Sequence, residues 1–251
     1  MFFGRKDWSA HVHNVEEVAL GPGFQALRDR IVELASPRAG EIAVDVGSGT
    51  GLLALALAPR LGTVWAIDSS RAMTEYLRVK AVSAELDNLR VVVASAVCLP
   101  LDACSADLVI SNYCFHEMHH RDKERGLAEA FRILKPGGRL VIGDMMFALN
   151  PACARDRRVV ITKLRAIGGR GLPGLARVLK NAVRIALGSW EHPANEAWWR
   201  EALKRAGFAG VRVELQPHEG GIVAATRPAM TAARLGTAPP QIVAPPGAPP
   251  A

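Results

Sequence analysis

Three alternate glycines stand between two acidic residues near the start of the chain. Gly47, Gly49 and Gly51 follow Asp45, and Asp68 comes 17 positions after the last glycine. Glycine allows backbone conformations that are closed to other residues, and it lets a ligand lie directly against the main chain. An acid at the end of the next strand is placed to accept hydrogen bonds from ribose hydroxyls. These residue types at this spacing therefore predict a nucleoside-binding site.

The apolar pattern around the glycines predicts the elements that position them. Residues 42–46 indicate a buried strand, 52–59 the helix that leaves the glycine turn, and 63–67 a second strand that ends at Asp68. Further strands are expected at 89–94, 107–112, 139–146, 211–215 and 222–226, with helices at 71–86, 123–135 and 196–203. Strands that alternate with helices are typical of a parallel sheet covered on both faces.

The spacing of the glycines favours a cofactor other than a dinucleotide. A dinucleotide-binding turn has the pattern G-x-G-x-x-G, whereas residues 45–51 have the pattern D-x-G-x-G-x-G, in which the acid suits a cationic ligand with an amino group. The pattern resembles motif I of the class I S-adenosylmethionine-dependent methyltransferases. The resemblance covers residues 40–147 and, more loosely, 195–227, and it includes L-K-P-G-G at 134–138 and A-G-F at 206–208. The alternative is a strand-to-helix turn that needs glycine only for its geometry.

The resemblance implies a Rossmann-like, doubly wound α/β sheet of seven strands, one of them reversed, with S-adenosylmethionine as the cofactor. It implies that Asp45 supports the amino acid end of the cofactor, Asp68 the ribose, and Ser95 with Ala96 the adenine. The full set of expected cofactor-binding residues is Asp45, Gly47, Ser48, Gly49, Gly51, Asp68, Ser69, Met73, Ser95, Ala96 and Asn112. Ser95 stands where many family members have an acid, and a hydroxyl accepts a hydrogen bond more weakly than a carboxylate.

A histidine-rich stretch follows the strand at 107–112. Ligands bind outside the carboxyl ends of the strands in such sheets, so residues 113–120 are expected to face both cofactor and substrate. A general base is needed only for a hydroxyl or a protonated amine acceptor, and the candidates are His116, then Tyr113 and His11. The alternative is that these residues are polar or capping groups without a chemical role. No metal is predicted, because the histidines at 116 and 119 are one residue too close for the H-E-x-x-H pattern.

The positive charge of the chain is concentrated in one segment. The 251 residues carry a net charge of +7, and residues 151–190 hold nine basic residues and one acidic residue. This segment predicts two amphipathic helices, at 154–167 and 172–187, as an insertion or lid after the fifth strand. Its charge is consistent with a solvated face, a pocket for an acidic or phosphate-bearing substrate, or a patch that contacts anionic lipid.

The expected organisation is an N-terminal helical cap at 1–40 and a methyltransferase-like domain at 41–227 that carries the basic insertion at 151–194. A disordered tail rich in proline and alanine is expected at 228–251. The N-terminus lacks a signal-peptide pattern, no run is apolar enough to span a membrane, and the four cysteines have no zinc-site spacing. A cytoplasmic protein with reduced thiols is therefore predicted.

These features together predict methyl transfer by direct displacement to a small, fairly apolar molecule, because the insertion is rich in leucine, isoleucine and valine. The sequence leaves the acceptor atom (O, N or C) and the oligomeric state open. One alternative is a non-catalytic protein on the same fold. Another is a membrane-surface methyltransferase that acts on a lipid or quinone through the basic helices at 151–190. No nucleic-acid partner is expected, because few aromatic residues interleave with the basic ones.

Overall fold

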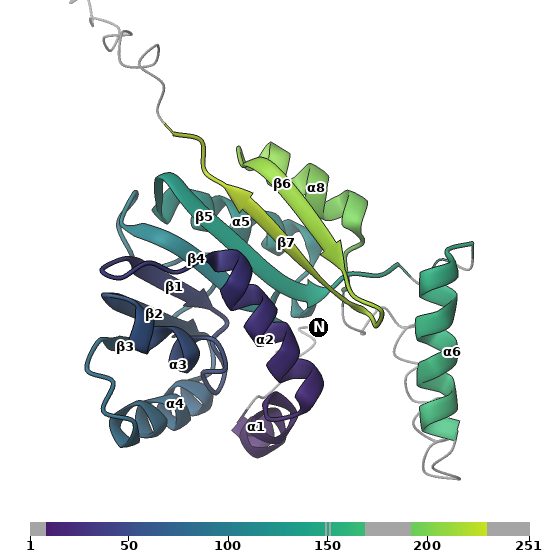
Figure 1. The fold of residues 1–251 in the computed structure, drawn as a ribbon, viewed down its shortest axis with the longest axis horizontal. Coiled ribbons are helices and arrows are strands. Elements are labelled where there is room, and N and C mark those ends of the chain that lie inside the picture. Colours follow the sequence, from purple (N-terminus) through teal and green to yellow (C-terminus); the bar gives the residue numbers. More distant parts are fainter. Residues whose placement is uncertain (1–8, 149, 151, 169–191, 230–251) are drawn as a thin grey trace, which may run out of the picture.

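The core of the molecule is a seven-stranded sheet in the order β3-β2-β1-β4-β5-β7-β6 (Figure 1). The computed structural model describes residues 9–148, 150, 152–168 and 192–229. The strands are β1 (Ile42–Val46), β2 (Thr63–Asp68), β3 (Leu89–Val93), β4 (Ala106–Asn112), β5 (Leu134–Met145), β6 (Ala209–Leu215) and β7 (Gly220–Thr226). Strand β7 runs antiparallel to both of its neighbours, and the other pairs are parallel. The prediction of a doubly wound sheet with one reversed strand is confirmed.

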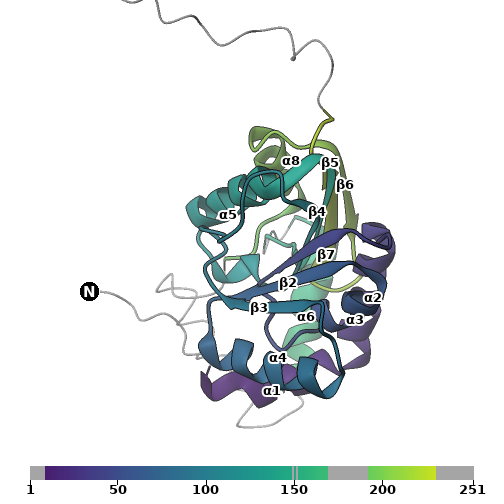
Figure 2. The ribbon, with the colours of Figure 1, turned by 90° about the vertical axis from the view of Figure 1, so that its left-hand side faces the viewer.

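Helices cover both faces of this sheet (Figure 2). The described helices are η1 (Ser9–His11), α1 (Val12–Ala19), α2 (Pro22–Ala35), α3 (Ala54–Leu57), η2 (Ala58–Arg60), α4 (Arg71–Ser83), η3 (Phe115–Glu117), α5 (His120–Ile133), α6 (Ala154–Gly168) and α8 (Glu196–Arg205). On one face Ile31, Leu57 and Leu77 from α2, α3 and α4 pack in one buried cluster. On the other face Leu127 of α5 and Trp199 of α8 belong to a second cluster. The parallel strands therefore have apolar residues on both sides, as a buried parallel sheet requires.

Strand β5 begins earlier than the sequence predicted. The expected helix at 123–135 ends at Ile133, and Leu134 already pairs with Ala106 of β4. The L-K-P-G-G segment at 134–138, expected to lie between helix and strand, is therefore part of the strand. Its attachment explains the difference, because Lys135 Nζ lies 2.8 and 2.9 Å from the two carboxylate oxygens of Asp107. Gly137 still has the unusual backbone expected of this segment, with φ of +82°.

Helices α3 and α4 are shorter than predicted. The helix expected at 52–59 is the four-residue α3, followed by the 3-10 turn η2 that contains Pro59. Proline has no backbone N–H and cannot continue the α-helical hydrogen-bond pattern. Helix α4 ends at Ser83 rather than near Leu86, and Glu85 has φ of +52°, a left-handed conformation outside the helical region.

The basic insertion is fastened to the sheet where it begins. Helix α6 matches the first predicted insertion helix, whereas the second, at 172–187, and most of the predicted tail lie outside the described residues. The Arg155 guanidinium donates to the backbone oxygens of Met146, Gln216, His218 and Gly220, at 2.6 to 3.0 Å. Arg155 is thus used to hold α6 against the β6–β7 hairpin. Among the described helices, none is long and apolar enough to cross a membrane.

Candidate active site

The glycine turn combines two positions that packing restricts with one that faces open space. All three glycines have positive φ. A Cβ atom on Gly47 would lie 2.2 Å from Cys114 Sγ, and one on Gly51 would lie 2.3 Å from Leu77 Cδ1. A Cβ atom on Gly49 would meet no protein atom within 4 Å. The turn is therefore packed against the protein at Gly47 and Gly51, and its middle is open to a ligand.

Asp45 and Asp68 lie at the carboxyl ends of β1 and β2, on either side of this turn. Asp45 is 1% exposed, and its Oδ2 accepts a hydrogen bond from the Ala54 N–H at 3.0 Å. Burial raises the pKa of Asp45 to about 7, against the Ala54 hydrogen bond and with a smaller contribution from Asp68. Burial also raises the pKa of Asp68, whose oxygens accept from the N–H groups of Gly49, at 2.9 Å, and Ser70, at 2.8 Å. Both carboxyls are thus held in place by backbone donors.

Two polar atoms beside the turn have no hydrogen-bond partner among the described residues. They are Ser48 Oγ, next to the central glycine, and Asn112 Oδ1, at the carboxyl end of β4, and both are buried. Buried polar atoms in proteins are nearly always hydrogen-bonded, so exceptions call for a bound group or an ordered water. The two atoms, the two carboxyls and the open side of Gly49 together fit a ligand with amino and hydroxyl groups, which S-adenosylmethionine has.

The residues expected around the adenine lie on two neighbouring segments. The Ala94 N–H donates to the Asp68 carbonyl oxygen at 3.0 Å, which places the following turn beside the end of β2. In that turn Ser95 forms an isolated bridge with Cys98. Met73 is 3% exposed in the first turn of α4, whose cap is Ser70 rather than Ser69. The adenine-binding roles stay predictions.

His116 is buried and ion-paired at the same edge of the sheet. Its Nδ1 lies 2.7 Å from Asp144 Oδ1, and its backbone N–H donates to Asp144 Oδ2 at 3.0 Å. Glu117 Oε1 lies 3.6 Å from the other ring nitrogen. Burial alone would lower the pKa of His116, but the carboxylates of Asp144 and Glu117 outweigh it and raise the pKa to about 10. The structure therefore brings one of the predicted catalytic residues into a carboxylate–histidine pair.

The other two candidates differ in their relation to His116. The Tyr113 ring meets the His116 ring edge-on, with centroids 5.6 Å apart, and it also packs on Phe24. Tyr113 has φ of +51°, a conformation that non-glycine residues seldom adopt. His11 is half-buried at the start of α1, which packs on α4. Its catalytic role stays a prediction, and the geometry favours Tyr113 as the closer partner of His116.

Comparison with known proteins identifies the family. Residues 43–138 match a family model described as a methyltransferase domain. The demethylmenaquinone methyltransferase of Clavibacter sepedonicus is 30% identical over 216 residues, which cover 84% of this chain and 82% of the relative. The chain belongs to the class I S-adenosylmethionine-dependent methyltransferases. The predicted family and its cofactor, S-adenosylmethionine, are confirmed.

Other methyltransferases match over shorter regions. The 27-O-demethylrifamycin SV methyltransferase of Amycolatopsis mediterranei is 31% identical over 153 residues, or 58% of this chain and 55% of that enzyme. The chain spans less than two thirds of such relatives, including 64% of an uncharacterized methyltransferase of Geobacillus thermodenitrificans. The phosphoethanolamine N-methyltransferase 2 of Haemonchus contortus shares the fold, with a TM-score of 0.68 and 16% identity over 88% of this chain and 57% of that chain.

Two residues of the candidate site, Asp144 and Lys123, were not predicted from the sequence. Asp144 was taken as part of an apolar strand, although an acid inside such a run is itself a signal of a buried polar role. Lys123 was taken as an ordinary residue at the start of a helix, yet it has no exposed surface. Neither could be assigned from the sequence, because the Asp144–His116 pair and the bonds of Lys123 to Met118 and His192 depend on how separate elements pack. Among the described residues no cluster of three or more His, Cys, Asp or Glu side chains could hold a metal ion.

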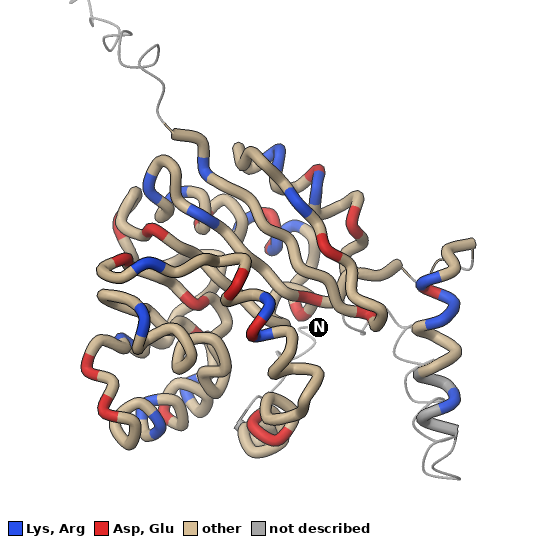
Figure 3. Tube along the Cα trace, viewed as in Figure 1, with Lys and Arg blue, Asp and Glu red and all other residues tan. Residues whose placement is uncertain are grey.

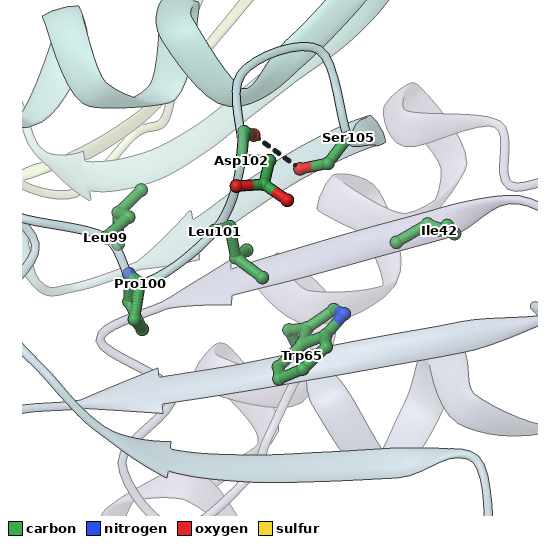
Figure 4. A pocket seen from close by; sticks show the side chains of 7 residues that line it. All are labelled: Ile42, Trp65, Leu99, Pro100, Leu101, Asp102 and Ser105. Atoms are coloured by element: carbon green, nitrogen blue, oxygen red, sulfur yellow. Dashed lines mark hydrogen bonds between the residues drawn. The ribbon is translucent and has the colours of Figure 1, made fainter.

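One cavity lies away from these residues. It has a volume of about 570 Å³ and lies over β1 and β2 on the face that α5 covers in part (Figure 4). Its lining consists of Ile42, Trp65, Leu99, Pro100, Leu101, Asp102 and Ser105. None of these is a predicted site residue of the methyltransferase. The candidate cofactor site therefore consists of the turn, the carboxyls and the unpaired polar atoms, and this cavity is not part of it.

Proposed function

We propose that this methyltransferase transfers a methyl group to a small, fairly apolar molecule that bears a hydroxyl, and that His116 takes the proton of that hydroxyl. The observation that carries the proposal is the buried His116–Asp144 pair, with Nδ1 2.7 Å from the carboxylate. It stands at the carboxyl ends of β4 and β5, the edge where Asp45 and Asp68 end the neighbouring strands. Ligands in open sheets of this kind bind at that edge.

The cofactor would be held by residues with distinct tasks. When bound, S-adenosylmethionine supplies a methyl group that its sulfonium has already activated. Asp45 would bind the amino group and Asp68 would accept hydrogen bonds from the ribose hydroxyls. The unpaired Ser48 Oγ and Asn112 Oδ1 would form hydrogen bonds with the ligand. The protein's part in such a displacement is to align the reacting groups and to exclude water.

The raised pKa of His116 determines how the pair would work. Asp144 and Glu117 raise that pKa to about 10, so the imidazole is protonated at neutral pH in the free protein. Only the neutral ring can accept a proton, and a nearby cation lowers the pKa of a histidine. A cationic cofactor bound at this edge would therefore lower the pKa of His116. A larger fraction of His116 would then be neutral and able to take the proton of the acceptor. We expect kcat to rise with pH as His116 loses its proton.

The choice of acceptor is supported by chemistry and by one relative. Removal of a proton from an acidic hydroxyl activates that oxygen, and in an aromatic alcohol it also activates the adjacent ring carbon. One histidine could thus serve O- or C-methylation. The Clavibacter relative is named for an apolar quinone, demethylmenaquinone, whose reduced form bears such hydroxyls. Reduced quinones are therefore the first acceptors to assay.

One calorimetric experiment tests the cofactor half of the proposal, and one substitution tests the acceptor half. The purified protein should bind S-adenosylmethionine and S-adenosylhomocysteine with micromolar affinity, whereas NAD should not bind. Asp68→Ala should abolish that binding, because the expected acceptor of the ribose hydroxyls is lost. His116→Gln should keep the affinity and lose about 10² to 10⁴ in methyl transfer. A protein that binds neither sulfur ligand would instead be a non-catalytic member of the fold.

A second candidate is that the enzyme takes its acceptor from a membrane surface. Helix α6 carries the exposed basic residues Arg157, Arg158 and Arg165 on a segment that stands apart from the sheet (Figure 3). Ile161 on the same helix is 46% exposed. Anionic lipid attracts such a helix through charge, and salt screens that attraction. Co-sedimentation with anionic vesicles at low but not high salt would support this route, and no sedimentation at either salt would exclude it.

A further inference from the structure

Lys123 is a cation without exposed surface in the first turn of α5. Burial of a charge is costly unless the charge is paired and hydrogen-bonded. Its Nζ donates to the backbone carbonyl oxygens of Met118 and His192, and it lies 6.0 Å from the centre of the Trp198 ring. Burial lowers the pKa of Lys123 to about 8, against the attraction of the Asp144 carboxylate. The Lys123 ammonium therefore holds two backbone segments together, one at Met118 and one at His192.

His192 is fixed by both of its backbone groups. Its carbonyl oxygen accepts from Lys123, and its N–H donates to the carbonyl oxygen of His116 at 2.7 Å. Its ring packs on that of His119 at an angle of 40°, with centroids 4.1 Å apart. Along the chain, His192 is the first described residue after 169–191, the greater part of the basic insertion. The end of the insertion is therefore attached directly to the turn that carries His116.

We propose that Lys123 is a positioning residue, which fastens the returning segment at His192 to the η3 turn and so holds His116 in its working orientation. The inference rests on the proposed role of His116. Lys123 would act through three hydrogen bonds. Its ammonium donates to the carbonyl oxygens of Met118 and His192, and the His192 N–H donates to the carbonyl oxygen of His116. It has no solvent-accessible surface, so it is not itself a catalytic residue.

The charges around Lys123 give this role a second, measurable consequence. Groups that face Lys123 or His116 come from every packed element: Asp144 from β5, Cys114 and Glu117 around η3, His119, His120 and Glu124 at the start of α5, and His192 itself. Asp144 attracts both Lys123 and His116. Removal of the Lys123 charge would leave that carboxylate to His116 alone, and His116 would bind its proton more tightly.

The test compares Lys123→Met with Lys123→Arg in the full chain without ligand, so that no acceptor needs to be known. Hydrogen exchange at the His192 amide and titration of the His116 ring are followed by NMR, and thermal melting shows that each variant is folded. In Lys123→Met the His192 amide hydrogen should exchange at least about tenfold faster, because loss of the bonds from Lys123 makes local opening of this segment easier. His116 should also titrate at a higher pH. Lys123→Arg should restore the titration.

A matched pair at His192 keeps the inference falsifiable if the Lys123 variants do not fold. His192→Pro removes the N–H that His116 accepts, and His192→Ala keeps it. We expect the proline variant alone to speed exchange in the 116–119 segment. With a reduced quinone as the assayed acceptor, it should lower kcat more than it raises KM, because the base is displaced. A folded Lys123→Met protein with wild-type exchange and titration would overturn the inference. Full activity in His116→Gln would instead overturn the proposed function and leave these ligand-free results unchanged.

Discussion

The cofactor side and the acceptor side of the site are built in different ways. Asp45, Ser48 and Asp68 lie within 24 residues of one another, and N–H groups of the backbone between them donate to both carboxyls. On the acceptor side, His116 depends on Asp144 and on Lys123 with His192, which come from separate elements. The first arrangement is set by one strand–turn–helix unit, whereas the second exists only after β4, β5 and α5 have packed.

The two sides should respond differently to substitution. The cofactor side leaves polar atoms unpaired and a glycine open, so its residues wait for a ligand. The acceptor side is already paired within the protein, because His116 and Lys123 are both hydrogen-bonded and buried. Changes on the cofactor side should therefore alter affinity first, and changes on the acceptor side should alter proton transfer and local order first.

The largest effect is expected from a methyl group on the open side of the glycine turn. In Gly49→Ala the new Cβ would enter the space where the cofactor is proposed to lie, and we expect S-adenosylmethionine binding to fall by at least about 10²-fold, as a lost buried contact of a few kcal/mol implies. Stability should fall only by the cost of a left-handed alanine, about 1 kcal/mol. Calorimetry and thermal melting measure the two effects separately.

Gly47→Ala is the matched control for that variant. Its Cβ would lie 2.2 Å from Cys114 Sγ, so packing has to shift in addition to the backbone strain. We expect it to cost about 1–3 kcal/mol more stability than Gly49→Ala. Equal melting temperatures for the two variants would contradict the contrast between a packed and an open glycine.

On the acceptor side, Asp144→Asn should lower kcat by about 10²-fold or more, because the carboxylate that orients and charges His116 is lost. The affinity for S-adenosylmethionine should stay within about twofold, since Asp144 is not among the proposed cofactor contacts. The pH at which kcat rises should move down from the alkaline range, because Asp144 is the group that raises the pKa of His116 most. Steady-state rates from pH 6 to 10 measure both changes. An unchanged pH profile would show that Asp144 does not control the proton transfer.

The same contrast explains what the sequence could predict. The glycine turn, Asp45 and Asp68 were readable because their chemistry depends on spacing within one short segment, and so was the alternation that fixes the sheet. Asp144 and Lys123 were not readable as site residues, because their partners lie 28 and 69 positions away in the chain. Local chemistry also misled at 134–138, where a proline and two glycines favoured a loop but pairing with β4 extended the strand.

The pH dependence of cofactor binding should report on Asp45. Its folded pKa is raised to about 7, so below that pH the free protein holds a neutral acid. An ammonium group of the ligand favours the ionised form, and binding must then release a proton. Affinity should rise about tenfold from pH 6 to pH 8 and then level off. Asp45→Asn should bind weakly with a flat profile between these pH values, and a slope that persists would assign the titration to Asp68, whose pKa is also raised.

The smallest effect is expected where this chain departs from its family. Ser95 occupies the position at which many family members have an acid, in a turn whose backbone is already closed by the Cys98 N–H bond to the Ser95 carbonyl oxygen. Ser95→Asp would offer a carboxylate without the need to rebuild the turn, and a charge-assisted hydrogen bond is about twice as strong as a neutral one. We expect affinity for S-adenosylmethionine to rise by about threefold to tenfold, which corresponds to roughly 1 kcal/mol. Ser95→Ala is the control and should lower it by a smaller factor. If Ser95→Asp weakens binding instead, the adenine is held by backbone groups of this turn, and the hydroxyl is not a substitute for the acid.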